Sequence, residues 1–174
     1  MKKLFLSLLV ASSFSMYAQK TINMFNYTSY IVTNSFGGGD RGNYSCLPLI
    51  ESKNTLPPGE TAIYTGYYNS HIPPATNLSN PPIDSWMVKL GAGNAVPQPS
   101  TSPMLIPLGS STDWVLNKFG ITDPNSGTFY GGDTVGGGCY NNPIIDQVNS
   151  SPSSPVTYQA VWFAAGGQTY FVIQ

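Results

Sequence analysis

Hydrophobic and polar residues alternate in short runs along most of the chain, and turn-forming residues separate these runs. Residues 21–27 (TINMFNY) form the first run, and residues 61–68 (TAIYTGYY) and 86–90 (WMVKL) form two more. None of them keeps the period of an amphipathic helix. Alternation with a period of two is typical of a β-strand that buries one face. The pattern therefore predicts a series of short strands joined by turns.

The strongest signal lies at the C-terminal end of the chain. Residues 156–164 alternate and place Tyr158 and Trp162 on one face, and residues 169–173 form a second apolar run. Gly166-Gly167 separates the two runs, and glycine pairs are typical of the tight turns that join antiparallel strands. These residues predict a C-terminal β-hairpin.

Two segments in the middle of the chain lack this clear alternation. Residues 104–106 are apolar and lie between two prolines, which predicts a short strand. Residues 111–120 fit a two-turn helix with capping oxygens at its start and a glycine at its end, and a strand over residues 114–119 fits nearly as well. Prolines recur between residues 69 and 111. Because proline interrupts helices and denies ladder hydrogen bonds, that region is expected to form long ordered loops or edge strands.

Many short strands separated by turns favour two layers of antiparallel sheet around one core. We therefore predict an all-β fold: a single-domain antiparallel β-sandwich, or a partly open barrel, with long Pro/Gly-rich loops. The interior is expected to consist of Ile, Val, Leu, Phe and Trp from the alternating positions. No linker divides the chain into two cores, so residues 19–174 are expected to form one domain.

Residues 1–18 have the pattern of a secretory signal peptide. Lys2 and Lys3 precede an apolar run over residues 4–11, and small residues and Ala18 follow it. The apolar run is shorter than the roughly 20 residues that a transmembrane helix needs. We expect cleavage after Ala18, a mature chain without a transmembrane segment, and a bacterial protein that is secreted, periplasmic or held at the cell surface.

Charge is scarce in this sequence. Charged residues are 9% of the chain, whereas about a quarter is usual. Removing Lys2 and Lys3 from the seven basic residues leaves five against eight acidic ones, a net charge of −3. Nucleic acid is excluded as a partner because such binding depends on clustered cations. An uncharged polar surface suits a neutral ligand such as a glycan, although an exported β-protein could equally tolerate few charges without one.

The two cysteines each follow the same short motif. Gly38-Gly39-Asp40 precedes Cys46 by the same interval as Gly131-Gly132-Asp133 precedes Cys139. Two cysteines in an exported protein are usually paired. We therefore predict a Cys46–Cys139 disulfide and expect it to bring the two glycine loops together.

Asp40 and Asp133 allow three interpretations. They could cap turns through their side-chain oxygens. They could hold Ca²⁺, which prefers hard oxygen ligands, although the chain lacks an acidic calcium loop. They could also be the acid and base of a glycosidase, which needs two carboxyl groups roughly 5–10 Å apart. Glu51 or Glu60 could replace either of them in that last role.

Aromatic side chains in the glycine loops are the better indication of a binding face. Tyr44, Tyr130 and Tyr140 lie in or beside these loops. Tyrosine combines a large apolar face with a polar group, which suits the C–H faces and hydroxyl groups of a sugar. Other chemistry has little support. His71 is the only histidine and more often caps a turn than serves a Ser-His-Asp triad, and the ligands for a zinc site are missing.

The sequence thus predicts a secreted, non-enzymatic binding or surface-interaction module, with a neutral carbohydrate as the favoured ligand. The predicted ligand-binding residues are Asp40, Tyr44, Tyr130, Asp133 and Tyr140. Two alternatives stay open: a small secreted hydrolase of the glycosidase type that uses Asp40 and Asp133, and an extracellular assembly or matrix protein whose strand edges pair with neighbours.

Overall fold

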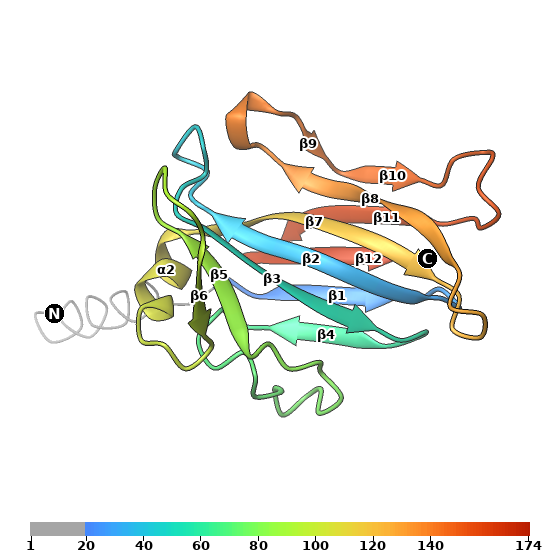
Figure 1. Cartoon of the computed structure of the whole chain (residues 1–174), viewed down its shortest axis with the longest axis horizontal. Coiled ribbons are helices and arrows are strands. Elements are labelled where there is room, and N and C mark those ends of the chain that lie inside the picture. The colour runs from blue at the N-terminus through green and yellow to red at the C-terminus, as the bar shows by residue number, and fades with distance from the viewer. Residues whose placement is uncertain (1–19) are drawn as a thin grey trace, which may run out of the picture.

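The computed structural model describes residues 20–174 and consists of two β-sheets packed face to face (Figure 1). One sheet has five strands in the order β10-β11-β12-β1-β4, and the other has seven in the order β6-β5-β3-β2-β7-β8-β9. The predicted all-β sandwich is confirmed, with two layers rather than one sheet closed on itself. The predicted signal peptide, residues 1–18, lies outside the described residues.

The five-stranded sheet combines the two ends of the described chain. Its strands are β1 (Ile22–Asn26), β4 (Thr61–Tyr64), β10 (Gln147–Asn149), β11 (Gln159–Ala165) and β12 (Gln168–Ile173). β1 pairs with β12 in parallel, and the other pairs are antiparallel. β11 and β12 are the predicted C-terminal hairpin, with Tyr158, Ala160 and Trp162 buried as the alternation required.

The seven-stranded sheet is antiparallel throughout. Its strands are β2 (Ile31–Gly39), β3 (Leu49–Leu56), β5 (Ser85–Lys89), β6 (Val96–Pro99), β7 (Asp113–Thr122), β8 (Phe129–Gly137) and β9 (Ile144–Ile145). Of the two assignments that residues 111–120 allowed, the strand is the observed one. Long pairing with both β2 and β8 outweighs the short helical signal.

The short strand predicted at residues 104–106 is wrong. These residues enter the helix α2 (Leu105–Ser111), in which Leu105 and Leu108 are buried. Pro107 lies in the first turn of this helix. Proline is tolerated there because the first N–H groups of a helix have no partner within it. The proline that suggested an interruption is therefore compatible with a helix start.

Aromatic rings fill the core between the sheets. Phe36 of β2 stacks on Tyr64 and contacts the edge of Trp86, and Tyr67 packs edge-to-face against both Trp86 and Trp114. All five side chains are at most 3% exposed. Burial of apolar surface, at roughly 25 cal/mol per Å², is the main free-energy source for this packing.

Polar residues also occupy the core, contrary to the purely apolar interior that was predicted. Asn34 donates to Asn54 Oδ1 at 2.8 Å and accepts a hydrogen bond from Asn117 at 2.8 Å. Asn54 donates in turn to the Tyr64 hydroxyl at 3.0 Å. This row of amides crosses β3, β2 and β7. Mutual hydrogen bonding offsets part of the cost of burying them, while Asn117 Oδ1 has no hydrogen-bond partner among the described residues.

Two of the four edge strands, β4 and β6, are covered or interrupted. At the edge strand β4, Asn80 Oδ1 accepts the Ile63 N–H and Asn77 donates to the Thr61 carbonyl. Pro97 and Pro99 interrupt the edge strand β6 and cannot donate to another strand. The proline-rich region thus forms ordered loops and an edge strand in part, as predicted, but it also contains the inner strand β5 and the helix α2, which its prolines were expected to exclude.

One side of the sandwich is bridged by a chain segment that changes sheet. β9 pairs with β8 in the seven-stranded sheet, and β10, which follows after Asp146, pairs with β11 in the five-stranded sheet. Figure 1 shows the two strands in line along this side. The Asp146 carbonyl accepts the Trp162 N–H at 2.8 Å and continues the pairing through the change of sheet.

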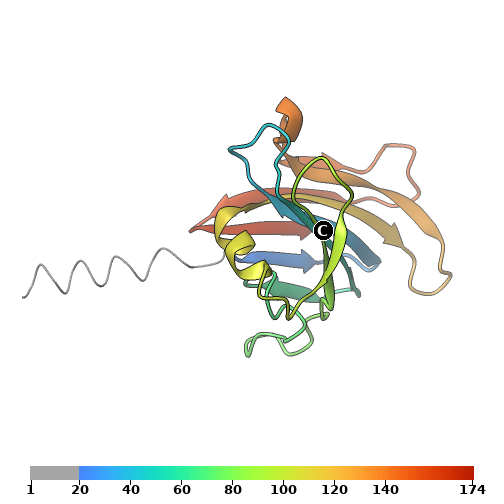
Figure 2. The same ribbon diagram turned by 60° about the vertical axis from the view of Figure 1, so that its left-hand side comes forward.

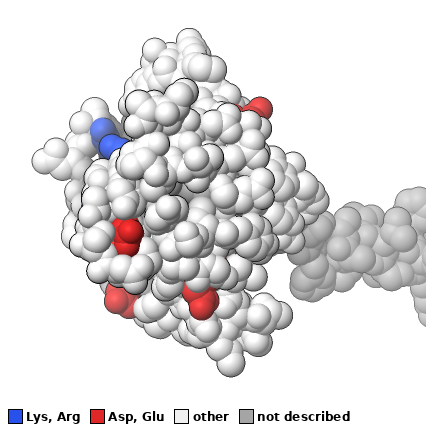
Figure 3. Space-filling view, turned by 90° about the vertical axis from the view of Figure 1, so that its right-hand side faces the viewer, with Lys and Arg blue, Asp and Glu red and all other residues white. Residues whose placement is uncertain are grey.

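The surface is largely uncharged. Figure 3 views the end of the sandwich that carries the β7–β8 turn, and charged side chains are sparse and scattered there. None of the helices within residues 20–174 has the length and apolar character that a membrane crossing demands.

Candidate ligand-binding site at the disulfide end

The predicted disulfide is confirmed and ties two loops at one end of the sandwich. Cys46 ends the loop that follows β2, and Cys139 begins the short 3-10 turn η2 (Cys139–Asn141) that follows β8, with their Cα atoms 5.4 Å apart. Figure 2 shows the β2–β3 loop beside η2. The Tyr140 N–H also donates to the Tyr44 carbonyl at 2.6 Å. We call this region the disulfide end.

Two of the three predicted tyrosines meet there. The rings of Tyr44 and Tyr140 pack edge-to-face with centroids 5.5 Å apart, and they remain 64% and 53% exposed. Asn43 fixes the Tyr44 loop, because its side-chain oxygen accepts the Ser45 N–H and its carbonyl accepts the Cys46 N–H. The pair is thus held in place although it faces solvent.

Next to this pair lies the outer hollow, a depression of about 410 Å³ on the outer face of the seven-stranded sheet. Its walls include Leu49, Leu116, Gly136, Tyr140, Pro143 and Ile145. Gly136 has φ +83°, and a Cβ built on it would lie 2.3 Å from the Val115 carbonyl oxygen. A glycine is therefore required at this position, where the lining of the hollow packs closely against the backbone of β7.

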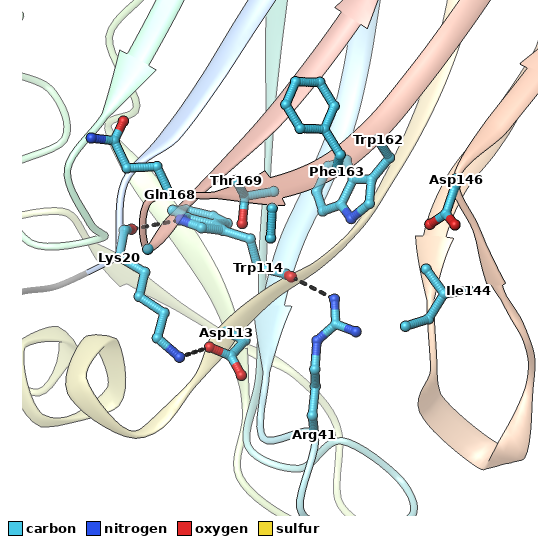
Figure 4. Close-up of a pocket in the computed structure, with 12 residues that line it drawn as sticks. Lys20, Arg41, Asp113, Trp114, Ile144, Asp146, Trp162, Phe163, Gln168 and Thr169 are labelled. Atoms are coloured by element: carbon cyan, nitrogen blue, oxygen red, sulfur yellow. Dashed lines mark hydrogen bonds and ion pairs between the residues drawn. The ribbon is translucent and has the colours of Figure 1, made fainter.

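A second depression, the inner hollow, lies on the other side of β9. Successive side chains of a strand point to opposite faces, so Ile145 faces the outer hollow while Ile144 and Asp146 face the inner one. The inner hollow has a volume of about 360 Å³ and opens between the ends of the two sheets. Figure 4 shows Arg41, Trp114 and Trp162 around it.

The inner hollow gathers four of the few charged side chains: Lys20, Arg41, Asp113 and Asp146. Lys20 forms an ion pair with Asp113, and Arg41 donates to the Trp114 carbonyl at 3.0 Å (Figure 4). Desolvation lowers the pKa of the Arg41 guanidinium from its ordinary value. Arginine nevertheless stays protonated in proteins, so this charge is permanent.

Asp40 and Asp133 do not lie together. Asp133 pairs with Phe119 across β7–β8, and Phe119 pairs with Asn34 across β2–β7, so Asp133 lies in the row of Asn34. Asp40 lies six positions further along the chain than Asn34 (34 to 40). At about 3.3 Å per residue, the two carboxylates are offset by roughly 20 Å. The disulfide joins the cysteines without aligning the aspartates, because the two motifs occupy different positions along parallel-running strands.

This offset corrects two sequence-based hypotheses. Asp40 and Asp133 cannot share a Ca²⁺ ion, and they are too far apart for a glycosidase pair. Within residues 20–174, no cluster of three or more His, Cys, Asp or Glu side chains is placed to hold a metal. Asp40 instead accepts the Gly42 N–H at 2.8 Å and caps a turn. Asp133 lies in strand β8. Burial of the Tyr158 phenol raises its pKa, and the negative charge of Asp133 raises it further.

Tyr130 also lies away from the disulfide end. It packs edge-to-face on Tyr30 with centroids 5.8 Å apart, and its hydroxyl donates to Asp123 at 3.3 Å beside the β7–β8 turn. Burial and the Asp123 charge raise its pKa. Tyr130 therefore supports the opposite end of the sandwich, and it cannot stack with Tyr44 and Tyr140 on one ligand.

His71 has a local structural contact. Its Nδ1 lies 2.7 Å from the Ser100 hydroxyl oxygen, and Ser100 is 2% exposed. A nucleophilic serine must be reachable by its substrate, so this buried contact fits a loop-fixing role rather than a hydrolase.

Sequence reasoning missed most residues of the inner hollow. Arg41, Asp146 and Phe163 come from three separate elements and carry no shared motif. The one available signal was Ile144-Ile145-Asp146, whose alternation places an acid and an apolar residue on the same face.

Comparison with known proteins supplies no relative: no family model and no curated protein match the chain, and no solved structure matches it. The function must therefore be argued from the geometry of the disulfide end.

Proposed function

We propose that this protein is an extracellular, non-enzymatic binding module whose outer hollow takes a neutral carbohydrate. The observation that carries the proposal is the lining of this hollow. A disulfide-anchored pair of exposed tyrosines borders it, and no charged side chain among the described residues lines it. A site without charge favours a ligand without charge, because a buried ion needs a partner.

The lining has the composition that a sugar requires. Leu116, Ile145 and the Tyr140 ring offer apolar surface to the C–H face of a pyranose. Ser45, Thr134 and Asn142 offer hydroxyl and amide groups at the same hollow. Small-molecule sites are typically mostly apolar, with a few polar groups that set orientation, and measure about 300–1,000 Å³. The outer hollow falls at the lower end of that range, the size of a short oligosaccharide segment.

Two further features support a binding module over the alternatives. The covered edge of β4 and the prolines of β6 disfavour assembly by strand pairing. The disulfide is typical of proteins in oxidising compartments, in agreement with an extracellular site of action.

A glycan array on the disulfide-bonded protein, followed by calorimetric titration of the best neutral ligand, tests this function. Tyr140→Ala is expected to weaken binding at least tenfold, because it removes the stacking surface. Tyr27→Ala is the matched control, since Tyr27 is 60% exposed and follows β1 at the opposite end of the sandwich. Absence of any neutral glycan ligand, or equal effects of the two variants, would contradict the proposal.

A further inference from the structure

Arg41 is the one cation of the inner hollow without a carboxylate partner. Among the described residues the only ion pair joins Lys20 to Asp113. Arg41 uses one hydrogen bond to anchor itself on the Trp114 carbonyl. Its remaining N–H groups are presented to the hollow, where Figure 4 shows the guanidinium between Trp114 and Ile144. A partly desolvated guanidinium with free donors is a binding site for a planar carboxylate, which it can hold through two parallel hydrogen bonds.

The acids of the same hollow limit what else the ligand can carry. Lys20 and Asp113 neutralise each other, which leaves the positive charge of Arg41 and the negative charge of Asp146. A polyanion such as a sulfated or phosphorylated chain would meet Asp146 without a second free cation. A ligand with one carboxylate and several hydroxyl groups fits better, because the Asp146 carboxylate can accept hydroxyl protons.

An apolar wall completes the hollow. Phe163 is 44% exposed at its rim and stacks on Tyr170 with centroids 4.9 Å apart and an interplanar angle of 7°. Tyr170 fixes one face of this ring, and the Phe163 side chain still offers apolar surface to a ligand. Trp162, the preceding residue of β11, points to the opposite face of the sheet and is almost fully buried. An apolar surface beside a cation and hydroxyl acceptors matches a sugar ring that carries a carboxylate.

We propose that the inner hollow is a second ligand site, which binds a uronic acid residue of an extracellular polysaccharide. Arg41 holds the carboxylate, Asp146 accepts hydroxyl protons, and Phe163 contacts the ring. The site uses none of the tyrosines of the outer hollow, so it stands or fails independently of the neutral ligand proposed there.

The test compares a disaccharide of one glucuronate and one neutral sugar with its methyl ester, by calorimetric titration of the disulfide-bonded protein. The acid is expected to bind at least tenfold more tightly than the ester, because esterification removes the charge and the paired oxygens that Arg41 would hold. Arg41→Gln is expected to abolish this preference. Lys118→Gln is the matched control, since it removes one exposed cation from the outer face of β7, and should leave binding unchanged.

Further measurements separate the two sites and guard against misfolding. Phe163→Ser should weaken uronate binding severalfold, whereas Tyr140→Ala should leave it unaltered even if no neutral ligand exists. Circular dichroism checks each variant, and if Arg41→Gln is unfolded, the acid–ester comparison and Phe163→Ser decide. Equal binding of acid and ester, full affinity in folded Arg41→Gln, or equally tight binding of a short peptide through its C-terminal carboxylate would overturn the proposal.

Discussion

The outer and inner hollows lie back to back on the same strand, yet their linings differ in kind. The outer hollow is lined without charge and has a tyrosine pair at its border, whereas the inner one holds four charged side chains and a phenylalanine at its rim. Ile145 faces one and Ile144 with Asp146 face the other. The difference shows how the alternation of a single short strand can divide one end of a sandwich into two chemically distinct surfaces.

The two hollows also share a tether. Tyr44 and Arg41 belong to the loop that ends at Cys46, and Tyr140 follows directly after Cys139. The covalent bond therefore fixes residues of both hollows. Substitutions that disturb both hollows should change the affinity for both ligands. Substitutions at residues of one hollow should change the affinity for one ligand only.

Loss of the tether is expected to have the largest effect. Replacing Cys46 and Cys139 together by serine opens a loop of 93 residues, for which the chain-entropy account gives about 4–5 kcal/mol of unfolding free energy. Both ligands should bind at least tenfold more weakly, because Arg41 and Tyr140 lose their common anchor. Urea denaturation and titration of both ligands measure these effects, and reduction of the unaltered protein should reproduce them. Retained affinity for both ligands would show that the tether is not shared.

The core beneath both hollows is expected to lose stability at alkaline pH. Desolvation raises the pKa of Tyr64 to about 12 and also raises that of Tyr67, which packs on Trp114 below Arg41. Between pH 10 and 12 the unfolded phenol releases its proton and the folded one keeps it. The free energy of unfolding therefore keeps its full value below pH 10. Above pH 10 it falls by about 1.4 kcal/mol per pH unit for each such tyrosine.

Denaturation series from pH 8 to 12 measure this slope. Tyr64→Phe should be less stable at neutral pH, because it loses its hydrogen bonds to Asn54 and to the Pro81 carbonyl. Its stability should nevertheless fall less steeply above pH 10. An unchanged slope in this variant would assign the alkaline loss to other groups.

Gly136→Ala separates the hollows. The added Cβ meets the Val115 carbonyl at 2.3 Å and requires a left-handed backbone, which should cost about 2 kcal/mol of stability. The neutral ligand should lose affinity because the floor of the outer hollow is displaced, whereas uronate binding should persist. Gly93→Ala is the control, since no atom lies within 4 Å of the added methyl group. Equal loss of both ligands would mean that the two hollows move together.

The strands could be predicted because their pattern is local. Alternation marked β1, β4, β5 and the C-terminal hairpin, and the cysteine pairing was inferred from the predicted export. The strand assignment of residues 104–106 failed because proline, which interrupts the interior of a helix, is tolerated in the first turn, where Pro107 lies. The buried amides of Asn34 and Asn117 could not be foreseen, because each is acceptable inside only with its partner from another strand.

The site was harder to predict because it depends on register. Gly38 and Gly131 occupy the same position of the repeated motif, yet a Cβ on Gly38 would overlap the Tyr67 hydroxyl in the core, whereas a Cβ on Gly131 would meet no atom of the described residues within 4 Å. The repeated Gly-Gly-Asp motif does not indicate how far along its strand each copy lies. Tyr44 and Tyr140 were brought together because each lies within two residues of a cysteine, and the disulfide is a constraint that sequence does reveal.

Tyr44→Ala should give the smallest of these effects and define the border of the outer hollow. Tyr44 contacts the Tyr140 ring and does not line the hollow itself. An edge-to-face aromatic pair contributes about 0.5–1.5 kcal/mol, so the neutral ligand should bind about three- to tenfold more weakly, less than the loss in Tyr140→Ala. Tyr44→Phe should retain full affinity because the edge contact survives without the hydroxyl. A Tyr44→Ala loss as large as that of Tyr140→Ala would instead place both rings in direct contact with the sugar.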